Sequence, residues 1–231
     1  MRLLRSNLAV IVAGLLAATP AFAQPAAAGP EPFAPEIEAF AAHDRAAPPA
    51  FCQIVFTGSS SVRFWTSLAR DMAPIPVINR GFGGSQISDV NAYFDRVVGA
   101  YHPRAVVFYA GENDIHAGEG AAEAVADFER FMALKTAKLG ATPVYFISLK
   151  PSKARLGEKP RQDEVNAKIR ALADARADLD YIDVVPAMLE ADGRPKDIFI
   201  ADGLHMTPAG YALWTAVVRP VVETAAKIPC G

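Results

Sequence analysis

Five short apolar runs recur along the chain, and each is followed by a segment whose apolar residues have helical spacing. The runs lie at residues 52–58, 75–81, 104–111, 142–149 and 179–185. Residues 121–140 place Ala124, Phe128 and Phe131 on one face of a helix, and residues 161–178 repeat this pattern. Strands that are apolar on both faces and joined through helices are typical of a parallel sheet covered on both sides. The pattern predicts a three-layer, doubly wound α/β domain with a five-stranded parallel sheet.

The first 35 residues differ in composition from the rest. Arg2 and Arg5 precede an apolar run, and Ala21-Phe22-Ala23 offers the A-x-A cleavage pattern of a secretory signal peptide. The run is shorter than the roughly 20 residues of a membrane anchor and is interrupted by Thr19-Pro20. The next residues are rich in proline and small side chains, as linkers are. We expect an exported, periplasmic or secreted protein without stable membrane insertion, divided into a signal peptide (1–23), a linker (24–35) and one domain (36–231).

The charge balance and the two cysteines limit the partners of the chain. Asp and Glu number 25 against 23 Lys and Arg, and loss of the signal peptide would remove two arginines. This mild acidity argues against a nucleic-acid partner, which needs a basic face. In an oxidising compartment Cys52 and Cys230 could form a disulfide; a buried Cys52 with a free Cys230 is the alternative, and the sequence leaves both open.

Polar and glycine-rich segments follow the predicted strands, where ligands bind in doubly wound folds. They read "TGSSSVRFW" after the first run, "NRGFGGSQ" after the second and "AGENDIH" after the third, while "ADGLHMTPAGY" precedes the last predicted helix. Any one alone would be explained as a helix cap or a tight turn. Together, at one edge of the sheet, they indicate a functional site.

The four segments resemble the motif blocks of the SGNH superfamily, also called GDSL hydrolases. The matching residues are Gly58-Ser59-Ser60, Asn79 to Gly84, Gly111-Glu112-Asn113-Asp114 and Asp202-Gly203-Leu204-His205. The resemblance implies a flavodoxin-like fold, with Ser60 as nucleophile, His205 as base and Asp202 behind it. It also implies an oxyanion hole of Ser60, Gly84 and Asn113. The usual aspartate before the serine is Ser59 here, which makes Ser59 and Ser61 alternative nucleophiles.

The chemistry explains why these residue types must converge. A serine hydroxyl is a weak nucleophile, so it needs an imidazole to take its proton and a carboxylate to orient that imidazole. Fixed donors around the developing oxyanion then stabilise the transition state, each by about 3 kcal/mol.

Other polar residues receive structural or open interpretations. Asp114 is expected to brace the loop that carries Asn113, and Arg80 to anchor the glycine loop. The basic loop 148–162 either contacts an anionic or sugar-bearing substrate or is simply solvated. The remaining histidines have no metal-ligand spacing, so neither a metal nor another cofactor is expected: His43, His102 and His116. Three aromatic residues are expected in the core or the cleft wall: Phe64, Trp65 and Phe82.

The sequence thus predicts an exported serine esterase that acts through an acyl-enzyme intermediate and needs no cofactor. Its substrate would be a short-chain, lysophospholipid-like or acetylated-carbohydrate ester, and the lack of an evident long apolar lid favours small or water-soluble esters. An acyltransferase with the same residues and a non-catalytic binding module of the same fold are alternatives. A nucleotide-binding protein is disfavoured, because the first loop has no glycine-rich phosphate-binding motif.

Overall fold

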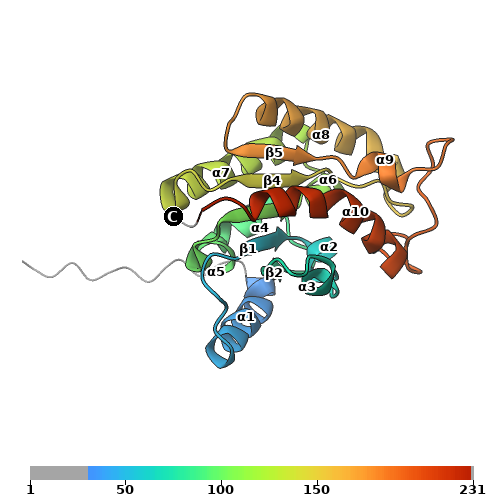
Figure 1. Cartoon of the computed structure of the whole chain (residues 1–231). Helices are drawn as coiled ribbons and strands as arrows, with labels where there is room; N and C mark the ends of the chain where they lie inside the picture. Colours follow the sequence, from blue (N-terminus) through green and yellow to red (C-terminus); the bar gives the residue numbers. More distant parts are fainter. Residues whose placement is uncertain (1–30, 230–231) are drawn as a thin grey trace, which may run out of the picture.

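The computed structural model describes residues 31–229, in which the five predicted strands form one parallel sheet. The strands are β1 (Ile54–Gly58), β2 (Val77–Gly81), β3 (Ala105–Tyr109), β4 (Val144–Ile147) and β5 (Leu179–Ile182). Their order is β2-β1-β3-β4-β5, and every neighbouring pair is parallel (Figure 1). This is the strand order of flavodoxin-like doubly wound sheets. The predicted fold class is confirmed.

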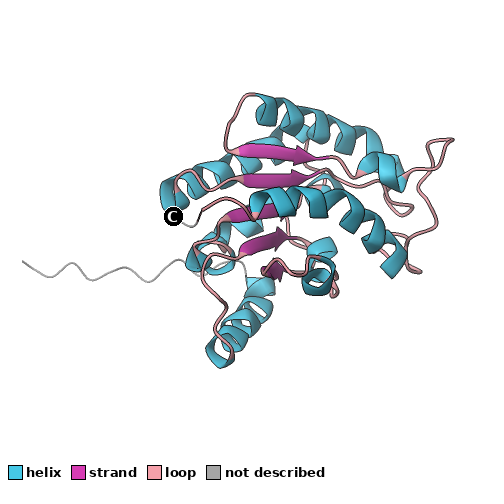
Figure 2. Cartoon of the chain, viewed as in Figure 1, coloured by secondary structure: helices cyan, strands magenta, loops and turns pink. Residues whose placement is uncertain are grey.

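Helices cover both faces of the sheet (Figure 2). One core cluster lies under α1 (Ala34–Ala46), α4 (Ile87–Ala92), α5 (Phe94–Val97), α7 (Ala121–Leu139) and α8 (Lys159–Asp174). The other lies under α2 (Ser60–Arg63), α3 (Leu68–Asp71), α9 (Val185–Met188) and α10 (Pro208–Ala225). Helix α6 (Glu112–His116) follows β3, and three short 3-10 segments complete the described elements: η1 (Glu31–Phe33), η2 (Gly99–Tyr101) and η3 (Leu156–Glu158).

Aromatic side chains fill the two cores on opposite faces of the sheet. On the α7 face, the Phe108 ring lies 4.5 Å from that of Phe131 and 5.2 Å from that of Phe128. On the α10 face, the Trp214 ring lies 4.9 Å from that of Tyr109. Rings at these separations pack favourably beyond the area they bury. The two cores hold the sheet rigid between its helical layers and fix the strand ends from which the site is built.

The folded part begins earlier than predicted. Residues 31–35 were assigned to the linker, but η1 and the start of α1 occupy them, and the Phe33 ring packs edge-on against Phe82 at 5.2 Å. Pro35 lies in the first turn of α1, where its missing N–H costs nothing. The predicted boundary between linker and domain was therefore wrong, because the proline-rich stretch contains Phe33, which packs on the core, and Pro35, which lies in the first turn of a helix. The predicted signal peptide and residues 24–30 lie outside the described residues.

The surroundings of Cys52 bear on the predicted disulfide. Cys52 is buried, and Arg104 Nε donates to its carbonyl oxygen at 3.2 Å. Arg104 Nη1 also donates to the carbonyl oxygen of Ala226, just after α10. Cys230 lies outside the described residues, so the disulfide stays a prediction.

Over residues 31–229, no helix is both long and apolar enough to cross a membrane.

Candidate active site

Ser60 stands at the end of the central strand β1. Gly58, the last residue of β1, has φ +129°, and a Cβ there would lie 1.9 Å from the carbonyl oxygen of Tyr109. Only glycine lets β1 pass so close to β3 before the chain turns into α2. Ser59 and Ser61 are buried, whereas the Ser60 hydroxyl meets His205. Of the three candidate serines, the structure brings Ser60 to the imidazole.

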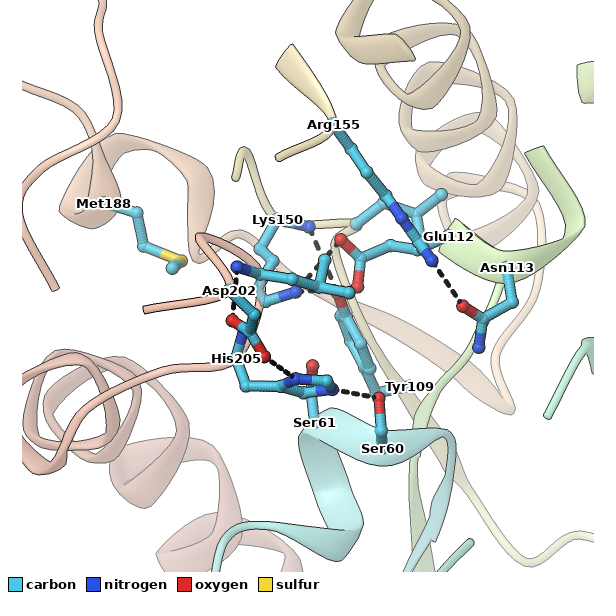
Figure 3. A network of polar contacts seen from close by, with 12 residues as sticks. Ser60, Ser61, Tyr109, Glu112, Asn113, Lys150, Arg155, Met188, Asp202 and His205 are labelled. Carbon is cyan, nitrogen blue, oxygen red and sulfur yellow. Dashed lines mark hydrogen bonds and ion pairs between the residues drawn. The ribbon is translucent and has the colours of Figure 1, made fainter. Parts of the chain in front are cut away.

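Asp202, His205 and Ser60 form a continuous series of hydrogen bonds (Figure 3). Asp202 Oδ2 lies 2.6 Å from His205 Nδ1, and His205 Nε2 lies 2.9 Å from Ser60 Oγ. Asp202 Oδ1 also accepts from the backbone N–H groups of Leu204 and His205, at 2.8 and 2.9 Å, which fixes the turn before α10. The loop places both side chains in series toward Ser60, an arrangement that their spacing in the sequence allows.

The charge of Asp202 selects the tautomer of the neutral imidazole. Partial burial raises the pKa of this carboxyl, but the hydrogen bonds from the His205 ring and from the Leu204 and His205 N–H groups outweigh it and lower the pKa to about 2. The carboxylate is therefore ionised at neutral pH and accepts from Nδ1–H, which leaves Nε2 as the acceptor for the Ser60 hydroxyl. This is the tautomer that a general base needs.

The predicted oxyanion donors lie on two neighbouring loops. Gly84 is exposed, has φ +80°, and no atom lies within 4 Å of a Cβ built there, so open space borders its Cα. The Asn113 Nδ2 donates to the carbonyl oxygen of Ser85 at 2.9 Å. The Ser85 hydroxyl in turn lies 3.3 Å from the Gly58 carbonyl oxygen. Ser85, which sequence reasoning missed, thus joins the serine, glycine and asparagine segments.

Arg155 contacts the other end of the Asn113 amide. Its Nη2 donates to Asn113 Oδ1 at 3.0 Å (Figure 3). A guanidinium only donates and the carbonyl oxygen of Ser85 only accepts, so the two contacts agree on which amide atom is oxygen and which is nitrogen. Arg155 lies in the basic loop 148–162, which was expected to contact substrate or to be solvated, yet its side chain turns inward.

A buried ion pair lies beneath the site. Lys150 Nζ donates to both Glu112 oxygens, at 3.0 and 2.8 Å, and the Tyr109 hydroxyl donates to Glu112 Oε2. Burial lowers the pKa of Lys150 against the opposing effect of Glu112, and burial together with the Glu112 charge raises the pKa of Tyr109. Sequence reasoning missed this pair. Its signal was an acidic residue shortly after an apolar strand, at the start of α6.

The remaining predicted residues have mostly structural contacts. Asp114 Oδ1 accepts from the Ile87 N–H at 2.9 Å, and Arg80 donates to the Asn79 carbonyl oxygen at 2.8 Å and pairs with Asp44. These contacts support the bracing and anchoring interpretations. Trp65 and Phe82 are buried in the core, His116 Nδ1 lies 2.7 Å from Glu158 Oε1, and two histidines are exposed at the surface: His43 and His102.

A cavity of about 420 Å³ opens beside His205. His205, Phe64, Ile200 and Tyr211 are among its lining residues. The Phe64 and Ile200 side chains are about half exposed, and the Phe64 ring packs edge-on against the His205 ring at 4.8 Å. The site thus offers an apolar, partly aromatic surface on the imidazole side of Ser60.

Comparison with known proteins agrees with this geometry. Residues 46–213 match the model of the GDSL-like lipase/acylhydrolase family. A protein of Streptococcus pneumoniae named for platelet activating factor has 19% identity, with 81% of this chain and 92% of that chain covered and a TM-score of 0.73. A GDSL-like lipase from Bacteroides thetaiotaomicron has 20% identity, 82% and 98% coverage and a TM-score of 0.70.

A carbohydrate esterase of family 3 from Talaromyces cellulolyticus has 16% identity, with 77% of this chain and 99% of that chain covered and a TM-score of 0.62. At these identities, the solved structures show a shared fold. No curated protein matches the chain. Since the family model spans most of the described domain, the chain belongs to the GDSL-like lipase/acylhydrolase family and is a carboxylic ester hydrolase.

Proposed function

We propose that Ser60 is the nucleophile of an acyl-enzyme mechanism. The Ser60 oxygen attacks the ester carbonyl carbon while His205 Nε2 takes the hydroxyl proton, and the carbonyl oxygen becomes an oxyanion. The N–H groups of Ser60 and Gly84 and the Asn113 amide donate to it. His205 then returns the proton to the leaving alcohol oxygen as the C–O bond breaks. Water, activated by the same imidazole, hydrolyses the acyl-serine. The observation that carries this proposal is the hydrogen-bonded series Asp202–His205–Ser60.

The cavity beside His205 supports a particular arrangement of substrate. Because His205 must protonate the leaving oxygen, the alcohol portion of the ester lies on the imidazole side of Ser60, where the cavity opens. The exposed Phe64 ring and the Ile200 side chain offer an apolar surface of the kind on which the C–H face of a sugar ring packs. We propose short acyl esters of a carbohydrate as substrates, ahead of lysophospholipid-like esters. A carbohydrate esterase among the structures that share the fold shows that this scaffold can act on such a substrate.

The proposal extends to the location of the protein. Residues 1–23 have the composition of a cleaved signal peptide, so we propose an exported enzyme, periplasmic or secreted, whose partner is its ester substrate rather than nucleic acid or the membrane interior. Transfer of the acyl group to a sugar hydroxyl instead of water would use the same residues. Product analysis with a sugar acceptor separates the two reactions.

Labelling with a fluorophosphonate tests the proposed nucleophile. A single adduct mapped to Ser60, absent in Ser60→Ala and strongly slowed in His205→Ala, is the expected result. Ser59→Ala is the matched control, because Ser59 is buried and its side chain makes no cap hydrogen bond. An adduct on Ser59 or Ser61, or none on folded protein, would contradict the mechanism. Faster hydrolysis of long-chain than of acetyl nitrophenyl esters would contradict the substrate assignment.

A further inference from the structure

Three carboxylates gather beside α6, on residues to which the hydrolytic reaction assigns no chemical role. One oxygen from each of Asp114, Glu119 and Asp127 lies within 4.8 Å of the other two. Asp114 belongs to α6, Asp127 to α7, and Glu119 to the turn between them. Gly118, at φ +104°, allows the chain to reverse there, and the Glu119 N–H donates to the Asp114 carbonyl oxygen at 3.0 Å. This chain reversal brings Glu119 close to Asp114.

Two acceptor oxygens at this place are buried without a hydrogen-bond donor. Asp114 is fully buried, and while its Oδ1 accepts from the Ile87 N–H, its Oδ2 has no partner. The Asn91 Nδ2 donates to the Asp127 carbonyl oxygen at 2.9 Å, but the Asn91 Oδ1 is also buried and unpartnered. A buried acceptor without a donor or cation is unfavourable. Asp114 is one of the three residues of the cluster, so a cation bound there would satisfy its unpartnered carboxylate oxygen.

Two side chains of the described residues donate to the carboxylates of the cluster, and only Arg130 is charged. Arg130 Nη1 pairs with Asp127 Oδ1, and Gln86 Nε2 donates to Glu119 Oε1 at 3.1 Å. Each of these contacts uses one oxygen of its carboxylate. The carboxylates of the cluster thus outnumber the one cation, Arg130, that pairs with them.

We propose that Asp114, Glu119 and Asp127 bind one Ca²⁺ ion. Ca²⁺ takes oxygen ligands at about 2.3–2.6 Å, so two of its ligands can lie up to about 5 Å apart, which matches the separation of these oxygens. Mg²⁺ demands near-ideal octahedral geometry at about 2.1 Å and gives up its water reluctantly, so a site of three carboxylates on separate segments suits it less well. The ion would join α6 to α7 next to Asn113 and so stabilise the segment that carries this amide. The proposal does not rest on the proposed substrate.

Calorimetric titration of Ca²⁺ into EDTA-treated, dialysed protein tests the site. The expected result is saturable binding of one ion, with weaker binding of Mg²⁺. At Ca²⁺ concentrations one hundred times the Kd, the Tm should rise by about 5–10 °C. Glu119→Gln and Asp127→Asn should each weaken binding at least tenfold. Glu129→Gln is the matched control, because Glu129 lies on the same helix but is exposed.

The variants also separate metal binding from a purely structural role. In EDTA, Glu119→Gln should be at least as stable as wild type, because it removes like-charge repulsion and keeps an acceptor for Gln86. A Tm well below that of wild type in EDTA would overturn the proposal. Absence of saturable Ca²⁺ binding at millimolar concentration would do the same, as would tighter Mg²⁺ binding or equal weakening in Glu129→Gln.

Discussion

Replacement of Arg155 by methionine tests whether its guanidinium holds the Asn113 amide in position for the oxyanion. The variant removes the 3.0 Å bond to Asn113 Oδ1 and leaves only the bond from Nδ2 to the Ser85 carbonyl oxygen. A hydrogen bond to a charged group contributes about 1.5–3 kcal/mol. If this free energy is lost from the transition state, kcat falls about 10- to 100-fold. This is a smaller loss than the roughly 10²–10³-fold that follows removal of a whole oxyanion donor. KM should change little, because the oxyanion forms only during reaction.

A double-mutant cycle with nitrophenyl acetate provides the assay. If Arg155 acts through Asn113, then Arg155→Met should change kcat less than about twofold in an Asn113→Ala background. Lys153→Met is the control, since Lys153 lies in the same loop but is exposed and pairs with Asp197. Additive losses would refute this reasoning. So would a raised KM with unchanged kcat, which would mean that Arg155 contacts the substrate itself.

Two further predictions concern stability. Lys150→Met should lower the free energy of unfolding by about 3–5 kcal/mol in chemical denaturation, because it leaves the Glu112 carboxylate buried without its cation. The double variant Lys150→Met/Glu112→Gln should recover part of this loss. Equal stability of Lys150→Met and wild type would contradict the buried pair. Hydrogen bonds from Arg176 and Lys135 hold the pKa of Asp178 at about 2. The ionised carboxylate therefore stabilises the folded state fully above its unfolded pKa near 4, and this stabilisation is lost as the pH falls through 2. Asp178→Asn should cost about 1 kcal/mol at pH 7, after allowance for solvent screening, and progressively less as the pH falls through 2. A loss that does not depend on pH would point to packing instead.

Local patterns predicted the fold and the grouping of the site because both follow from the sheet. Buried strands are apolar on both faces, so their positions were visible in the sequence. Since the carboxyl ends of parallel strands share one edge, Ser60, Gly84 and Asn113 had to lie near one another. His205 was identified through the family motif, and the structure places its Nε2 2.9 Å from Ser60 Oγ.

The inward orientation of the basic loop could not be predicted from its own composition. Lysine and arginine beside prolines usually indicate a solvated loop, and the burial of Lys150 depends on Glu112, which lies 38 residues earlier. The acidic cluster was missed for a related reason. Histidine spacing gives no sign of it, because Asp114, Glu119 and Asp127 meet only where the chain reverses at Gly118.

Lys150 and Arg155, whose inward orientation the sequence did not predict, connect the same two segments of the site. Glu112 and Asn113 are consecutive at the start of α6, and Lys150 and Arg155 lie on the loop after β4. The Lys150–Glu112 ion pair and the Arg155–Asn113 hydrogen bond are therefore parallel connections between the same two segments. Because the first is buried and expensive to break, it fixes the separation at which the second can form. These two contacts hold the Asn113 amide in place from within the protein, and such preorganisation is what the proposed oxyanion donor requires.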